Sequence, residues 1–136
     1  MHEVTYKATK KVSEKNRLEA ELLFDLGLNT NDYYKKIEYY SKSIELNSEC
    51  SDAYCKLGEA KSFLGHDADA IKDFDQAIRL KPEDPDAYIG RASAKSALGH
   101  NAEAIEDYDQ AVIRLNSKDS HSLYYVYFLR GRVNEE

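Results

Sequence analysis

Apolar and small side chains recur along residues 51–80 at steps of three and four positions. This is the period of an α-helix that buries one stripe of side chains and exposes the rest. The stripe is interrupted at Gly65, where a helix end favours a residue that tolerates a left-handed backbone. We therefore predict two helices joined by a short turn. Their buried positions are Tyr54, Leu57 and Gly58, followed by Ala70, Ile71, Phe74, Ala77 and Ile78.

The same pattern returns 34 residues further on. When Ser51–Asp84 is laid over the chain from Pro85 onward, 16 of the first 27 positions are identical. The segment 81–85 separates the two units, because proline cannot continue a helix but fits its first turn. Self-similarity at a fixed period of this length is the signature of a stacked repeat protein. The chain therefore contains two copies of one helical hairpin.

Weaker copies flank these two units. Upstream, the apolar positions of residues 37–46 lie 34 places before those of 71–80, which predicts the second helix of an earlier, degenerate repeat. Leu26-Gly27 aligns with Leu64-Gly65 only if four extra residues lie in a Leu28–Asp32 loop. This alignment places the first helix over about residues 14–26, with Ala20 at the close-packing position. Downstream, Ser120–Arg132 would be the first helix of a third copy, and it would cap the stack.

Residues 51–84 resemble the tetratricopeptide repeat, a 34-residue helix–turn–helix unit. The second unit departs from the family pattern at three places: Arg91 replaces a leucine, Ser117 replaces a proline, and residues 111–115 contain one extra residue. We expect this insertion to lengthen the helix or form a small bulge. The matching positions in the first unit are Tyr54, Leu57, Gly58, Leu64, Gly65, Ala70, Phe74, Ala77 and Pro82.

The resemblance implies an all-α fold, an α-solenoid of antiparallel helix–turn–helix repeats with about seven helices. We expect a flexible N-terminal arm at 1–12, a degenerate repeat at 13–50, repeats at 51–84 and 85–119, and a capping helix at 120–136.

Composition narrows the classes of partner. The net charge of −6 would repel the phosphate backbone of nucleic acids and anionic membrane surfaces. Neither a signal-peptide core nor a run of about 18 apolar residues is present, so we expect a cytoplasmic protein. Cys50 and Cys55 are too few and too oddly spaced for a disulfide framework or a CxxC metal site.

Three basic residues occupy positions that are apolar in the family. Position 11 of each unit lies near the start of the second helix in an antiparallel pair, so Lys61 should reach Asp73 and Lys95 should reach Asp107. Arg91 is the third such residue. The alternative interpretation is that these are surface cations without fixed partners.

Proteins that resemble this one usually bind through the concave wall made by the first helices. The alternative is that these positions are only solvated surface. The wall would carry Asp52, Cys55, Lys56, Glu59, Ser62 and Phe63, followed by Asp86, Ile89, Gly90, Ser93, Ser96 and Ala97.

The chaperone-tail clamp of this family needs lysine, asparagine and arginine donors at fixed wall positions. Those positions hold Cys55, Glu59, Gly90, His121 and Tyr125, or, one unit earlier, Arg17, Glu21, Lys56, Asp86 and Gly90. Neither set supplies the donors, so a chaperone C-terminal tail is not the expected partner.

The segment 123–129 is apolar on every side of a helix. One face should pack on the preceding helix and the rest could cap the stack. Alternatively, Tyr124, Tyr125 and Phe128 could form a docking patch for a peptide or for a second copy of the chain.

No motif points to catalysis, a cofactor or a metal. There is no phosphate-binding glycine loop and no recognisable set of nucleophile, base and orienting group. His66 and His100 recur 34 residues apart but lie at helix ends without a second ligand nearby. We therefore expect an adaptor or scaffold that binds a protein or peptide, or else a self-associating array or a regulatory subunit.

Overall fold

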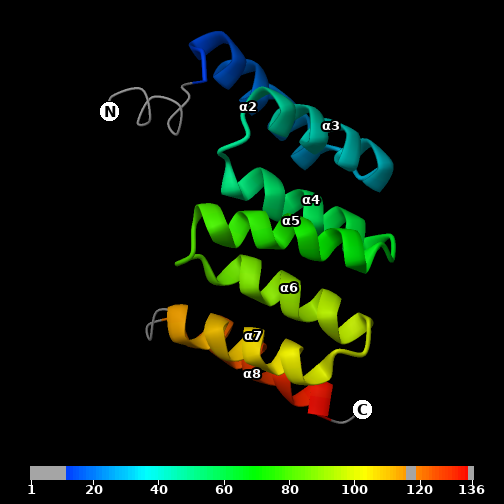
Figure 1. The fold of residues 1–136 in the computed structure, drawn as a ribbon, viewed down its shortest axis with the longest axis vertical. Helices are drawn as coiled ribbons and strands as arrows, with labels where there is room; N and C mark the ends of the chain where they lie inside the picture. Colours follow the sequence, from blue (N-terminus) through cyan, green and yellow to red (C-terminus); the bar gives the residue numbers. More distant parts are fainter. Residues whose placement is uncertain (1–11, 116–118, 135–136) are drawn as a thin grey trace, which may run out of the picture.

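The computed structural model describes residues 12–115 and 119–134, and within these ranges the chain is a stack of helices without strands. Consecutive helices pair as hairpins that lie side by side along one long axis (Figure 1). The described helices are α2 (Glu14–Asn29), α3 (Tyr33–Leu46), α4 (Ser51–Phe63), α5 (Asp67–Leu80), α6 (Pro85–Ala97), α7 (Asn101–Arg114) and α8 (Ser120–Asn134). The predicted all-α solenoid is confirmed.

Glycine turns separate the helices of the two matching units, as the sequence indicated. Gly65 and Gly99 have φ of +86° and +84°, a backbone conformation that glycine adopts without strain. The N–H of His66 donates to the Lys61 carbonyl at 2.9 Å, which satisfies a carbonyl left free at the end of α4. The turns are therefore encoded by the repeated Leu-Gly-His segment.

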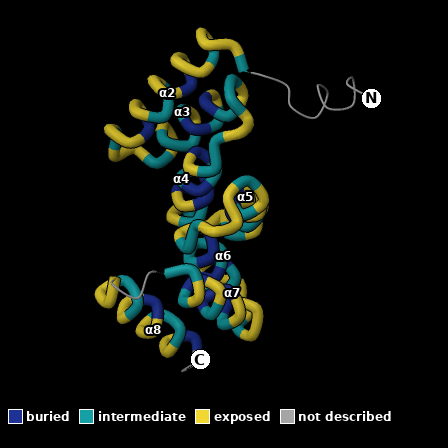
Figure 2. Tube along the Cα trace, turned by 90° about the vertical axis from the view of Figure 1, so that its left-hand side faces the viewer, coloured by how far each residue is buried: buried dark blue, intermediate teal, exposed yellow. Residues whose placement is uncertain are grey.

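Aromatic rings packed on helical glycines hold adjacent hairpins together. Phe74 is 1% exposed and lies between Gly58 of its own hairpin and Gly90 of the next. A Cβ added at Gly58 would be 2.9 Å from the ring, so a larger residue would not fit. Within the first hairpin, Tyr40 packs on Gly27 as Phe74 packs on Gly58. Figure 2 shows the buried positions following the inner faces of the helices.

The first hairpin differs from the expectation in one respect. α2 continues to Asn29, so Leu28 and Asn29 belong to the helix and the predicted Leu28–Asp32 loop is wrong. Gly27 is not a turn glycine equivalent to Gly65, because it faces Tyr40 inside the helix. Ala20 is buried as predicted, and its carbonyl accepts the Ser43 hydroxyl at 2.8 Å.

The extra residue of the second unit does not lengthen α7 or interrupt it. α7 has 14 residues, as α5 has, and Leu115 follows it with an extended backbone at ψ 140°. The insertion is therefore taken up in the connection to α8. Ser117 and residues 1–11 of the predicted N-terminal arm (1–12) lie outside the described residues.

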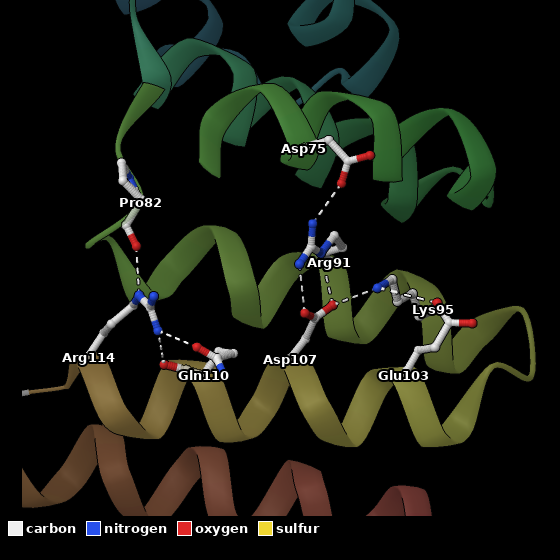
Figure 3. Close-up of polar contacts among 8 residues, drawn as sticks. All are labelled: Asp75, Pro82, Arg91, Lys95, Glu103, Asp107, Gln110 and Arg114. Carbon is white, nitrogen blue, oxygen red and sulfur yellow. Dashed lines mark hydrogen bonds and ion pairs between the residues drawn. The ribbon is translucent and has the colours of Figure 1, made fainter. Parts of the chain in front are cut away.

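Ion pairs join the two helices of each matching unit. Lys61 Nζ lies 3.0 Å from Asp73 Oδ2, and Lys95 Nζ lies 3.1 Å from Asp107 Oδ2. Both predicted pairs are confirmed. Arg91, which replaces a leucine, donates through Nε and Nη2 to the two oxygens of Asp107 at 2.9 and 2.8 Å (Figure 3).

Arg91 also links neighbouring units, because its Nη1 lies 2.8 Å from Asp75 on α5. A second arginine makes a similar connection, since Arg114 Nε donates to the Pro82 carbonyl at 2.6 Å (Figure 3). The Arg114 guanidinium lies 4.4 Å from the centre of the Tyr88 ring. These contacts fix the angle between successive hairpins and thereby the shape of the surface they enclose.

Candidate functional site

A cleft of about 340 Å³ opens between α6 and α8. Asp86, Ile89 and Ser93 line it from successive turns of α6, because residues three and four apart share one helix face. Tyr125 and Leu129 line it from α8, and Glu59 contributes from α4. In Figure 2 the tube of α8 stands on the same side of the stack as α4 and α6.

Packing against α7 determines which side of α8 faces this cleft. Val126 and Val133 of α8 are 0% and 5% exposed and belong to the core cluster that contains Tyr108 of α7. Arg130 Nε donates to Asp109 Oδ1 on α7 at 2.7 Å. These contacts orient α8 so that Tyr125 and Leu129 face the cleft.

Two further clefts continue this one along the stack. A cleft of about 440 Å³ shares Glu59 with it, and a cleft of about 220 Å³ shares Ser93 and Leu129. We call the three clefts together the groove. The larger of these two clefts is lined by Leu28, Tyr33, Lys36, Tyr40, Lys56, Glu59, Ala60 and Phe63, and the smaller by Ser93, Ser96, Ala97, Tyr108, Leu129, Arg132 and Val133.

An aromatic stack forms part of the groove wall near α3. The rings of Tyr33 and Phe63 lie with centroids 3.9 Å apart and planes 11° apart. Lys36 Nζ donates to the Gly27 carbonyl at 2.9 Å, and Lys56 Nζ lies 3.5 Å from Glu59. Both cations are therefore partly neutralised by groups of the chain itself.

The middle of the groove is electronegative. Burial raises the pKa of the Asp86 carboxyl, and the neighbouring carboxylates of Asp84 and Asp52 raise it further, while Lys56 acts in the opposite direction. A carboxylate that is costly to ionise gains from a cation brought into contact with it. A positively charged group in contact with the Asp86 carboxylate would therefore lower the cost of its ionisation.

Most of the wall residues singled out from the sequence lie on the groove. The structure places on it Lys56, Glu59, Phe63, Asp86, Ile89, Gly90, Ser93, Ser96, Ala97 and Tyr125. Asp52, Tyr124 and Phe128 are exposed but do not line the three clefts. The predicted wall did not include five further groove residues, because it was drawn from the first helices of the two matching units: Tyr33, Lys36, Leu115, Leu129 and Arg132.

Cys55 is a correction to the predicted wall. Its side chain is buried in the core cluster that contains Phe74 and Ala87, and its thiol donates to Glu59 Oε2 at 3.8 Å. Burial raises the pKa of this thiol, and Glu59 raises it further. Cys55 is therefore a packed and weakly nucleophilic residue.

The two recurring histidines are at helix starts. His66 and His100 are the N-cap residues of α5 and α7, and neither side chain makes a capping hydrogen bond. Over residues 12–115 and 119–134, no three metal-ligating side chains come together. None of the helices in the described part is long and apolar enough to cross a bilayer.

The stacked hairpins and the groove on their inner side define a class of protein, the helical-repeat solenoids. The family model of the tetratricopeptide repeat matches residues 51–84 and 85–112. By this match, residues 51–112 consist of two tetratricopeptide repeats. No curated protein sequence matches it closely enough to count as a relative.

Solved structures similar to the chain have the same fold. A T3SS complex from Aeromonas hydrophila superposes with a TM-score of 0.86 at 15% identity, covering 98% of this chain and 95% of the other. PcrH in complex with the chaperone binding region of PopD gives 0.81 at 14% identity, covering 93% and 97%. The TPR2B-domain:pHsp70-complex of yeast Sti1 gives 0.74 at 25% identity, covering 90% and 95%.

Proposed function

We propose that the chain is a protein-interaction module whose groove holds an extended protein segment carrying basic and apolar side chains. The observation that carries the proposal is the pairing of Glu59 and Asp86 with Ile89 and Tyr125 in one cleft. Two of the similar structures are complexes with a protein region or peptide, PcrH with PopD and Sti1 with pHsp70. These complexes support protein binding as the class of function. The chemistry that we propose for the partner is based on the residues that line the groove.

A basic side chain is the best match to the two carboxylates. It would form charge-assisted hydrogen bonds with Glu59 or Asp86, and such bonds are stronger than those between neutral groups. The neighbouring Ile89 and Tyr125 offer apolar surface for the next side chain of the segment. An Arg or Lys beside an aliphatic or aromatic residue is therefore the expected core of the ligand.

The same charges make an acidic chaperone tail an unsuitable ligand. Glu59 and Asp86 would repel its carboxylates, and the family's clamp positions hold Cys55 and Gly90, which supply no charged donor. Cys55 is also buried. The partner that we propose therefore differs in charge from the chaperone tails bound by other members of the family.

The proposal involves neither catalysis nor a cofactor, and it places the chain in the cytoplasm. The family is one of protein-interaction modules, and the groove chemistry described above is that of recognition. A partner protein with an exposed basic segment is sufficient to account for the acidic middle of the groove.

A displayed library of random peptides tests this function directly. The wild-type chain should enrich peptides with a basic residue next to an apolar one. Replacing both groove carboxylates, Glu59→Lys with Asp86→Lys, should abolish that motif or replace it by an acidic one. Glu106→Lys, the same change at an exposed position of α7 outside the groove, should leave it unaltered. Recovery of the same basic motif by the double variant would contradict the proposal.

A further inference from the structure

Two exposed apolar stripes lie outside the groove, one on α2 and one on α8. These two helices are at opposite ends of the long axis (Figure 1). On α2 the side chains of Leu18, Leu22 and Leu26 are 54%, 60% and 41% exposed. They are four residues apart and share one helix face, which we call the leucine stripe. α2 and α8 are too far apart for this stripe to be covered by α8 of the same molecule.

The second stripe is on α8 and consists of Tyr124, Tyr127 and Phe128, which we call the aromatic stripe. These side chains are 78%, 57% and 56% exposed. In the aligned first helices, the position of Tyr127 holds Gly58 or Ala92, small residues that let the second helix of the hairpin approach. The larger side chain of Tyr127 would keep the second helix of a further repeat from approaching α8 as closely.

Gly131 adds an unfilled notch beside the aromatic stripe. Gly27, Gly58 and Gly90, which are also within helices, each have an aromatic ring against the place where a Cβ would be. Gly131 has nothing within 4 Å of that place. It lies three residues after Phe128 and seven after Tyr124, on the same helix face. The space beside Gly131 is therefore open to a side chain from another molecule.

Charge decides between the possible occupants. α2 carries four acidic and two basic residues, whereas α8 carries Arg130 and Arg132 and no acidic residue, in a chain whose net charge is −6. Arg130 is paired with Asp109 of α7, so Arg132 is the charge of α8 that remains beside the aromatic stripe, and it favours the acidic α2 of a second copy over another α8. Glu19, Asp25 and Lys15 flank the leucine stripe, which leaves one net negative charge beside it, and Arg132 flanks the aromatic stripe.

We propose that the aromatic stripe of one copy packs on the leucine stripe of a second copy, with a leucine side chain at Gly131. This contact joins unlike surfaces, so each copy keeps one stripe free and the association continues head to tail. A single pair of helices covers less than the roughly 1,200 Å² of a stable interface, so the assembly should depend strongly on concentration.

Sedimentation of mixed variants tests this arrangement. The wild-type mass should rise above 15.6 kDa with concentration. Leu22→Asp and Phe128→Asp, each with one stripe blocked, should remain monomeric alone. Mixed in equal amounts they should form a dimer of twice the monomer mass and no larger species, because each supplies the stripe that the other lacks. Ile113→Asp, at a 71% exposed position of α7, should assemble as the wild type does.

Three results would overturn the proposal. The wild type could remain monomeric at all concentrations, Leu22→Asp could still assemble through a symmetric α8 contact, or the mixed variants could remain monomeric. Circular dichroism establishes that each variant is folded, and the substituted side chains are exposed. The stripes do not line the groove. Absence of self-association would therefore leave the proposed peptide binding unaffected, and absence of peptide binding would leave the proposed self-association unaffected.

Discussion

A methyl group added at Gly90 should destabilise the stack, because Phe74 has no room to move. A Cβ at Gly90 would overlap the Phe74 ring, and the opposite side of that ring lies against Gly58. Overpacking of this kind costs about 1–3 kcal/mol. Alanine is favoured over glycine inside a helix by about 1 kcal/mol, which offsets part of this cost. The expected net effect of Gly90→Ala is a loss of about 0–2 kcal/mol in the free energy of unfolding.

Gly131→Ala is the matched control. It makes the same chemical change within a helix, at a glycine that has no atom within 4 Å of the added Cβ. It should stabilise the chain by about 1 kcal/mol. The two variants should therefore differ by about 1–3 kcal/mol.

Urea unfolding followed by circular dichroism measures this difference, at a concentration where the chain is monomeric. With a slope of about 1.5–2 kcal/mol per molar urea, the two midpoints should be separated by about 0.5–2 M. Equal midpoints for the two variants would show that Phe74 is not wedged between the hairpins, and the packing described above would be wrong.

Three further predictions follow from single contacts and titrating groups. A double-mutant cycle with Lys61→Met and Asp73→Asn should show a coupling of about 0.5–2 kcal/mol in the free energy of unfolding. A coupling of zero would show that this ion pair does not stabilise the fold. Because the pKa of Asp86 is raised in the folded chain, ionisation of this carboxyl destabilises the fold as pH rises through that pKa. Asp86→Asn should therefore be more stable than the wild type at neutral pH. It should lose this advantage below the ordinary aspartate pKa of about 3.9. In a thiol-labelling time course, Cys50 should react first and Cys55, buried and with a raised pKa, only after unfolding, and equal rates would contradict its burial.

The repeat could be predicted from the sequence because local signals and long-range packing agree in it. Gly65 and Gly99 end their helices in the left-handed conformation that the pattern indicated. The identity at a shift of 34 residues also placed Lys61 opposite Asp73, since equivalent residues occupy equivalent places in antiparallel hairpins.

The first hairpin shows where such reasoning fails. Leu26-Gly27 has the letters of the Leu64-Gly65 turn, but Gly27 serves to admit the ring of Tyr40, and α2 continues past it. Only the position of the next helix distinguishes a glycine required by a turn from one required by a neighbouring ring. The same limit applies to Cys55, whose burial depends on how the next hairpin docks on α4.

Only part of the groove could be predicted, because its lining also depends on how the helices pack. Its α4 and α6 residues follow from the position of each residue within a repeat. Its other wall depends on α8, and the placement of α8 is determined by Val126, Val133 and the Arg130–Asp109 contact with α7. Spacing along the sequence does not contain this information, because the connection before α8 includes the extra residue.

Site-specific photo-crosslinking tests the central claim, that the inner groove is the surface which binds a protein segment. A photoreactive residue replaces Ile89 in the groove or, in a second variant, the exposed Ile113 of α7. A basic peptide chosen from the displayed library is then added to each. We expect a crosslink from position 89 that excess unlabelled peptide removes, and none from position 113. Equal crosslinking from both positions, or crosslinking from position 113 alone, would contradict it.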